Sequence, residues 1–187
     1  MLDKAETPLS GLFVLTPRRF GDNRGFFSES WNRARMAEIG LDVDFVQDNH
    51  SLSRDVGTVR GLHFQAPPVA QDKLVRCGRG AIFDVAVDIR AGSATYGQWY
   101  GLELSHENGK QLFVPKGFLH GFQTLEADSE ILYKCSDIYS PPDEGTVMWN
   151  DPELAINWPI KTDAILSERD SAAPSFASFE TPFGASP

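Results

Sequence analysis

Short runs in which apolar and polar residues alternate recur along most of the chain. These runs are rich in Val, Ile, Phe, Tyr and Trp, and Gly, Pro, Asn or Asp residues separate them. Alternation with a period of two is typical of strands, and frequent turns between short strands indicate a sandwich or a barrel. We therefore expect an all-β fold with strands in residues 11–17, 25–31, 44–51, 58–65, 72–78, 81–89, 98–105, 111–115, 118–125 and 130–138.

Helices are predicted in only two places. The segment WNRARMAEIG, residues 31–40, has a helical pattern that Gly40 would close. The second helix is expected around TDAILSERD, where Asp163 is a candidate N-cap. A few short helices on a mostly stranded chain do not change the fold class.

The whole chain, residues 1–187, is long enough for one domain with a sizeable core. Its last stretch, residues 171–187, is rich in Ser, Ala and Pro. We expect this C-terminal tail to be loosely ordered, although its three phenylalanines offer a way to dock it on a surface.

The segment AIFDVAVDIR shows the alternation most clearly. Phe83, Val85 and Val87 share one face of this strand, whereas Asp84 and Asp88 share the other. A strand with a polar second face either exposes it to solvent or lines a polar cavity with it. Exposure to solvent is the commoner case.

Charge and cysteine content narrow the possible partners and the compartment. The net charge is −9, from 17 Lys and Arg against 26 Asp and Glu, which argues against a nucleic-acid-binding surface. Cys77 and Cys135 lie in strand-like runs and are interpreted as reduced core thiols. The N-terminus carries no signal-peptide pattern, and no run is long enough to span a membrane. We therefore expect a cytoplasmic protein that binds neither nucleic acid nor membrane.

Several polar residues share faces of the predicted strands. These are Gln47 with Asn49, His63 with Gln65, and a series that includes Tyr133 and Tyr139. Inward-facing polar side chains need either each other or a ligand as hydrogen-bond partners. Strict alternation places Arg60 opposite His63. Both can face one cavity only if Gly61 marks a β-bulge or if Arg60 serves a neighbouring subunit.

Known sequence motifs exclude some chemistry. The stretch from Pro115 through Gly117 to His120 resembles the second motif of the cupin superfamily, whose first motif supplies a His-x-His pair. The corresponding place reads His63-Phe64-Gln65, so one ligand is missing and no metal is expected. The chain also has no G-x-G-x-x-G and no Walker loop, and the missing dinucleotide fingerprint removes a hydride route for inverting a carbon centre.

Several segments between about Leu9 and Asp170 stand in an order that matches a known family. They are above all VRGLHFQAPPVAQDKLVR, together with DNRGFFSESW, FVQDNHSLS, FVPKGFLHGF, ILYKCSDIYSPPDEG and WNDP. In these segments the chain resembles the dTDP-4-dehydrorhamnose 3,5-epimerase family. The resemblance implies a cupin-like β jelly roll, a homodimer, no cofactor and a dTDP-4-keto-6-deoxyhexose substrate.

Site residues follow from the resemblance by motif position. It implies that His63 is the base that removes the protons at carbons 3 and 5, oriented by Asp170. It implies that Tyr133 is the acid on the opposite face, and that Lys73, helped by His120, stabilises the enolate oxygen. The residues implied to hold the nucleotide and sugar are Arg24, Glu29, Gln47, Asn49, Arg60, Glu144 and Arg169, with Phe20, Phe26 or Tyr139 stacking on the thymine.

Physical chemistry makes these roles sensible. A proton beside a ketone can be removed when a preorganised cation stabilises the enolate. A histidine base suits neutral pH, and an aspartate behind it fixes the tautomer. Two positions depart from the family pattern, because Arg169 stands where lysine is usual and Ile138-Tyr139 where two aromatics are common.

Other interpretations stay open at this point. Taken singly, Tyr133 fits a core aromatic and Lys73 a solvated cation. As a whole, the chain also fits a single-position epimerase of another deoxysugar pathway. A metal-dependent cupin oxygenase or isomerase and a catalytically silent sugar-nucleotide-binding module are two further classes.

Overall fold

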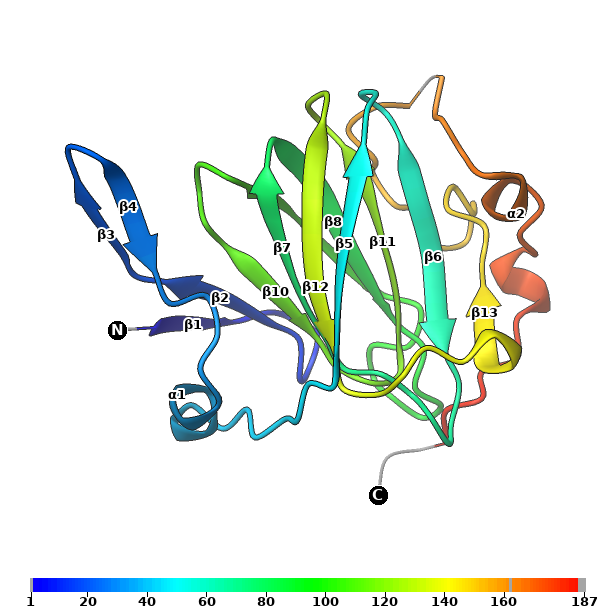
Figure 1. Ribbon diagram of the computed structural model, residues 1–187. Helices are drawn as coiled ribbons and strands as arrows, with labels where there is room; N and C mark the ends of the chain where they lie inside the picture. Colours follow the sequence, from blue (N-terminus) through cyan, green and yellow to red (C-terminus); the bar gives the residue numbers. More distant parts are fainter. Residues whose placement is uncertain (1, 162, 185–187) are drawn as a thin grey trace.

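The computed structural model describes residues 2–161 and 163–184 and confirms an all-β architecture (Figure 1). All strand pairs in its three sheets are antiparallel. The six-stranded sheet has the order β1 (Leu2–Glu6), β2 (Phe13–Pro17), β10 (Gln111–Val114), β7 (Lys73–Arg79), β12 (Ser129–Cys135) and β5 (Gln47–Ser53). The five-stranded sheet has the order β13 (Glu144–Thr146), β6 (Val59–Gln65), β11 (Phe118–Thr124), β8 (Ala81–Asp88) and β9 (Trp99–Ser105).

A separate hairpin projects from one end of the molecule (Figure 1). It consists of β3 (Arg19–Asp22) and β4 (Gly25–Ser28). Three phenylalanines of this hairpin, Phe20, Phe26 and Phe27, are exposed. An exposed group of aromatic side chains is a feature of interaction surfaces.

Apolar side chains fill three layers of the fold. The first layer lies between the two large sheets and includes Val75, Ile82 and Ile131. The second covers the outer face of the five-stranded sheet, where Val85 and Val87 meet residues of the C-terminal third of the chain. The third covers part of the outer face of the six-stranded sheet beneath the segment that contains α1 (Arg33–Glu38). The space between the two large sheets therefore contains an apolar layer and, beside it, polar side chains that line cavities.

The strands predicted from alternation are present, and three short ones were missed. Strands β1, β3 and β13 all lie outside the predicted segments. They contain three to five residues each, which is too short to show a period of two clearly.

One helix prediction is confirmed and the other needs a correction. Helix α1 ends just before Gly40, which adopts the left-handed φ of +83° expected of a residue that closes a helix. Helix α2 (Glu168–Ser171) begins later than predicted, and its N-cap is Ser167, whose hydroxyl accepts from the backbone N–H of Asp170 at 3.1 Å. The prediction of Asp163 as the cap is wrong, because Asp163 has a φ of +58° in the preceding loop.

The C-terminal segment packs against the sandwich, which differs from the loose order expected of residues 171–187. Phe183 is buried in the second apolar layer, and its carbonyl accepts from the Ala91 N–H at 3.0 Å. Phe176 lies in a short 3-10 helix (Phe176–Ser178), and its N–H donates to Asp151 at 2.8 Å. The phenylalanines therefore dock the segment as far as residue 184, and residues 185–187 lie outside the described residues.

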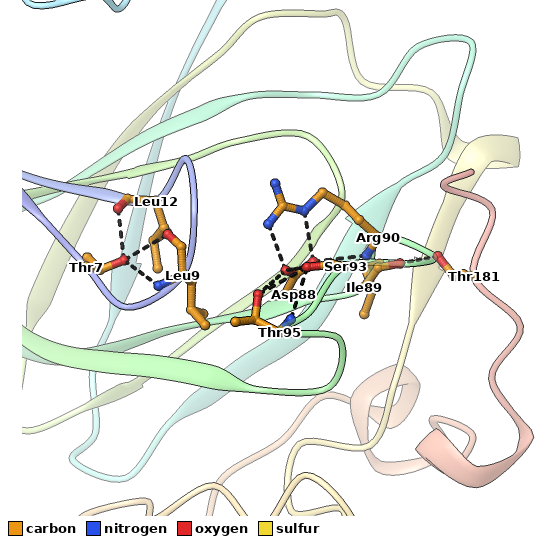
Figure 2. Close-up of polar contacts among 9 residues, drawn as sticks. All are labelled: Thr7, Leu9, Leu12, Asp88, Ile89, Arg90, Ser93, Thr95 and Thr181. Atoms are coloured by element: carbon orange, nitrogen blue, oxygen red, sulfur yellow. Dashed lines mark hydrogen bonds and ion pairs between the residues drawn. The ribbon is translucent and has the colours of Figure 1, made fainter. Parts of the chain in front are cut away.

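The polar face of β8 is buried, so the commoner solvent-exposed case does not apply. Asp88 is 0% exposed and accepts hydrogen bonds from the backbone and guanidinium of Arg90 and from the hydroxyls of Ser93 and Thr95 (Figure 2). Burial alone would raise the pKa of Asp88, but these donors outweigh it and lower the pKa to about 2. Beside this cluster, the Thr181 hydroxyl donates to the Ile89 carbonyl and ties down the C-terminal segment (Figure 2).

Among residues 2–161 and 163–184, every helix is too short or too polar to cross a membrane.

Candidate active site

Two adjoining cavities lie between the large sheets, with volumes of about 420 Å³ and about 340 Å³. His63, Lys73 and Tyr133 border both of them. His63 is on β6 of the five-stranded sheet, whereas Lys73 and Tyr133 are on β7 and β12 of the six-stranded sheet. The shared residues therefore come from opposite walls, and we treat the two cavities as lobes of one site.

His63 and Asp170 form a hydrogen-bonded pair. The imidazole Nε2 lies 2.6 Å from Asp170 Oδ1, and the two side chains are 26% and 4% exposed. Burial alone would raise the pKa of Asp170, but the hydrogen bond and the charge interaction with His63 outweigh it and lower the pKa. An ionised Asp170 fixes the Nε2 side of the ring, so Nδ1 is the nitrogen left to exchange a proton with a ligand.

A bulge at Gly61 resolves the expected conflict between Arg60 and His63. Along the pairing of β6 with β11, His120 faces His63 and Phe122 faces Arg60, so β6 has one extra residue in this interval. Both Arg60 and His63 consequently line the larger lobe. Gly61 has a φ of +128°, and a Cβ there would lie 2.6 Å from the Cα of Gly121. Only glycine fits this backbone.

Lys73 and Tyr133 form the opposite wall. Burial lowers the pKa of Lys73, and the negative charges of Glu144 and Asp84 act in the opposite direction. Burial also raises the pKa of Tyr133, so its hydroxyl keeps its proton at neutral pH. This wall therefore presents a buried lysine amine and a protonated tyrosine hydroxyl.

A second His–Asp pair involves His120, which lines the larger lobe. His120 Nε2 is 2.9 Å from Asp84 Oδ1, and both side chains are buried. The other oxygen of Asp84 is buried and has no hydrogen-bond partner within the described part of the chain. His120 and Lys73 therefore line the same lobe.

Several predicted binding residues build the rim of the smaller lobe. Gln47 accepts from the Tyr139 N–H at 2.8 Å and donates to Asn49 at 3.1 Å. Asn49 in turn donates to the Cys135 sulfur at 3.7 Å. Gln65 accepts from the Ser140 N–H at 2.9 Å. These contacts fix the loop that carries Tyr139 against the mouth of the lobe.

Glu144 and Arg169 join the two lobes. Glu144 borders the smaller lobe and Arg169 the larger one, and the two side chains form an ion pair. Tyr139 donates its hydroxyl hydrogen to Glu144 at 2.5 Å. Burial alone would raise the pKa of Glu144, but the hydrogen bonds from Tyr139 and Arg169 outweigh it and lower the pKa. The carboxylate is therefore ionised at neutral pH.

Four predicted substrate contacts do not reach either lobe within this chain. Arg24 is in the turn between β3 and β4 and pairs with Asp22 at 2.6 Å. Glu29 pairs with Arg35 at 3.1 Å. Phe20 and Phe26 are exposed on the same hairpin. These residues were expected in the site, but the hairpin, which Glu29 directly follows, projects away from the cavities of its own chain (Figure 1).

Sequence reasoning also missed residues that line the larger lobe, among them Ser51, Thr58 and Ser167. Ser51 continues the i, i+2 register of Gln47 and Asn49 on β5, and this register was the available signal. Its hydroxyl is buried and has no hydrogen-bond partner among the residues that the structure describes. In the same part of the chain, no three His, Cys, Asp or Glu side chains are grouped to hold a metal ion.

Comparison with known proteins connects this geometry to a family. A family model described as dTDP-4-dehydrorhamnose 3,5-epimerase matches residues 6–178. A protein named dTDP-4-dehydrorhamnose 3,5-epimerase from Sinorhizobium fredii is 55% identical over 174 residues, which cover 91% of this chain and 87% of the relative.

Solved structures agree in fold over nearly the whole chain. A dTDP-6-deoxy-D-glucose-3,5-epimerase from Legionella pneumophila, in complex with dTDP-4-keto-L-rhamnose, has a TM-score of 0.95 at 42% identity, and the match covers 100% of both chains. A dTDP-4-dehydrorhamnose 3,5-epimerase from Bacillus anthracis, with TDP and PPi bound, has a TM-score of 0.91 at 48% identity and covers 94% of this chain and 99% of that one. The predicted cupin-like fold is thereby confirmed.

Proposed function

The chain belongs to the dTDP-4-dehydrorhamnose 3,5-epimerase family, and we propose that it converts dTDP-4-keto-6-deoxyglucose into dTDP-4-keto-L-rhamnose by inverting carbons 3 and 5. The observation that carries this proposal is the arrangement of His63 and Tyr133 on opposite walls of one site. Inversion at a carbon needs a base on one face of the sugar ring and an acid on the other. The reaction proposed here draws on side chains alone and uses no cofactor.

His63 is the base in this mechanism. Its Nδ1 takes the proton from a carbon beside the C4 ketone, and the C–H electron pair moves toward C4 to form an enolate. Ionised Asp170, hydrogen-bonded to Nε2, supports the imidazolium that results. General base catalysis by a positioned histidine contributes about 10²- to 10⁴-fold to a rate.

Lys73 and Tyr133 complete the step from the opposite wall. Lys73 is placed to stabilise the negative charge that develops on the C4 oxygen, with His120 close by in the same lobe. Tyr133 then gives its hydroxyl proton to the other face of the carbon, which inverts the centre. Its raised pKa supports this role, because the hydroxyl is protonated when the enolate forms.

The nucleotide part of the substrate is expected along the rim. Arg60 and Arg169 both border the larger lobe, and guanidinium groups bind phosphate oxygens with good geometry. Gln47, Asn49 and Tyr139 border the smaller lobe, where an aromatic ring and amides suit a base and a sugar. The ligands in the Legionella pneumophila and Bacillus anthracis structures support this substrate class.

In a homodimer, the hairpin residues would be able to contact substrate in the site of the partner copy. Arg24, Glu29, Phe20 and Phe26 lie on or next to a projecting hairpin, so their predicted contacts require the site of a second copy. Tyr139, which lines the smaller lobe, is exposed like these phenylalanines, as are Val46 and Ile138, which adjoin the lining residues Gln47 and Tyr139 in the chain. Sedimentation analysis of the wild type and of Phe27→Asp tests this assembly, because a charge at that position should dissociate a dimer.

We also infer that the chain works as a single domain and acts in the cytoplasm. The apolar layers on both faces of the five-stranded sheet share its strands, which supports one cooperative unit. Cys77 and Cys135 are buried and unpaired, as expected of a protein in a reducing compartment.

Proton exchange in heavy water tests the proposed reaction. The protein is mixed with dTDP-4-keto-6-deoxyglucose, and NMR follows deuterium at carbons 3 and 5. Deuterium at both positions is expected. Deuterium at one position would favour the single-position epimerase, and no exchange together with tightly bound iron or manganese would replace the proposal with a metal-dependent cupin reaction.

A further inference from the structure

Glu144 holds two groups that reach it from different parts of the chain. The hydroxyl of Tyr139 and the guanidinium of Arg169 both donate to the same carboxylate oxygen, Oε2. The Glu144 side chain is 13% exposed, whereas that of Arg169 is 46% exposed. One oxygen of this carboxylate is occupied by two protein donors, and the carboxylate is less exposed than its cation. Such a group is well suited to fix the positions of the segments that donate to it.

The Arg169 contact leads directly to the catalytic pair. Arg169 and Asp170 are neighbours in α2, and the carboxylate of Asp170 contacts His63. Helix α2 contains four residues, and a helix of one turn is not stable by itself. Its position therefore depends on contacts with the rest of the protein, and the Glu144–Arg169 pair is one of them.

The other end of Glu144 is tied to the strand that carries His63. Glu144 is the first residue of β13, which pairs with β6 so that Thr146 lies opposite His63. Glu144 itself lies opposite Gln65, which holds the loop next to Tyr139 through Ser140. One carboxylate thus connects the sheet that carries the base, the helix that carries its aspartate and the ring at the rim.

We propose that Glu144 is a positioning residue that fixes α2 relative to β6 and thereby sets the His63–Asp170 contact. This inference rests on the proposed function, in which that contact supports the base. Glu144 then acts as a clamp between Tyr139 and Arg169. Arg169 uses one nitrogen for Glu144 and keeps further N–H donors for phosphate.

The test compares variants of the full-length protein. Glu144→Leu removes the acceptor, Glu144→Gln keeps an amide oxygen as an uncharged acceptor, and Arg169→Met removes the other partner. Glu130→Leu is the matched control, because Glu130 also contacts a ring and an arginine, His50 at 3.0 Å and Arg79 at 3.9 Å, on the outer face of the other sheet. Each variant is measured for kcat and KM, for thermal stability, and for the far-downfield proton resonance of the His63–Asp170 hydrogen bond.

Positioning predicts a specific pattern. Glu144→Leu should lower kcat about 20-fold with KM changed less than about threefold, and it should weaken or broaden the downfield resonance. Glu144→Gln should recover most of the kcat and the resonance. The double variant Glu144→Leu/Arg169→Met should be no worse than the poorer single variant, because both substitutions break one contact. Glu130→Leu should leave kcat and the resonance unchanged.

Other outcomes would overturn the inference. A raised KM at unchanged kcat would make Glu144 a direct substrate contact, and an unchanged resonance with unchanged kcat would leave it no positioning role. If Glu144→Leu does not fold, the resonance of Arg169→Met carries the test, because this variant breaks the same contact; an unchanged resonance there would overturn the inference. The resonance is measured without turnover, so a wild-type protein that fails to exchange substrate protons would refute the proposed function and leave the positioning result intact.

Discussion

Two buried aspartates show how the same side chain serves different ends in this fold. Asp88 is 0% exposed and accepts five hydrogen bonds, all from residues within seven positions of it. Asp170 is 4% exposed, and its side-chain partner His63 is 107 residues away in the sequence. Donors from one short segment saturate Asp88 (Figure 2). Asp170 instead holds an imidazole whose other nitrogen faces a cavity.

The contacts of Asp88 stabilise the fold, whereas the contact of Asp170 with His63 serves the reaction. Saturated contacts within one segment hold the β8–β9 connection and leave nothing for a ligand to use. A single long-range contact aligns a reactive group and leaves its working atom free. We therefore expect substitutions at Asp170 and His63 to reduce activity more than stability, and substitutions at Asp88 to do the reverse.

The largest expected effect is the loss of the base. His63→Ala should lower kcat by about 10³-fold or more, because no other group replaces Nδ1 as proton acceptor at this wall. Its melting temperature should stay within a few degrees of wild type, because His63 lines a cavity and contributes little to the core. Steady-state kinetics and thermal unfolding of the same preparation measure both quantities, and a variant that unfolds would instead assign His63 to the core.

Asp170→Asn should have the next largest effect. The amide keeps the shape of the side chain but removes the charge that supports the imidazolium, so kcat should fall by about 10²- to 10³-fold with KM little changed. Kinetics over a range of substrate concentrations separates the two parameters. A change confined to KM would contradict the role given to Asp170 here.

Asp88→Asn should give the opposite profile. The lowered pKa of Asp88, about 2 against a usual 3.8, corresponds to about 2 kcal/mol of folding free energy at neutral pH. The variant should lose stability of this order while kcat at 25 °C stays at the wild-type value. Urea unfolding and kinetics measure the two changes, and a variant that keeps its stability but loses activity would remove the contrast between the two aspartates.

The smallest effect is the pH dependence that follows from the same group. The folded pKa of Asp88 lies below its unfolded value, so its contribution is complete above about pH 4 and is lost as the pH falls toward 2. Wild-type stability should therefore decline more steeply across this window than that of Asp88→Asn. Urea titrations at pH 4.5, 3.5 and 2.5 compare the slopes, and equal slopes would assign the low pKa to another cause.

Local patterns in the sequence predicted most of the fold and one wall of the site. Alternation placed the long strands, and the i, i+2 register of Gln47 and Asn49 pointed to a polar inner face. The same rule was insufficient at Gly61, where one extra residue turns Arg60 and His63 toward the same cavity. A bulge depends on the partner strand, which a single sequence does not display.

Long-range placement accounts for the remaining differences. The contact of Asp170 with His63 was available only through resemblance to a family, because nothing local marks an acid at the end of a chain as the partner of a distant histidine. Arg24, in the hairpin, and Glu29, directly after it, belong to a segment that matches the family, but they do not line the cavities of their own chain. For Asp84 and Asp88 the sequence left both a solvent-exposed face and a polar cavity open, with exposure the commoner case, because burial depends on what other segments of the chain cover.

The most direct test of the two-wall mechanism is exchange without inversion in Tyr133→Phe. In heavy water, this variant keeps the base on its wall but lacks the proton donor on the other. Deuterium should enter at the proton-bearing carbons beside the ketone while the configuration of the sugar is retained, and His63→Ala should show neither exchange nor inversion. Inversion at the wild-type rate in Tyr133→Phe would contradict the account, because the second proton would then come from a group other than Tyr133.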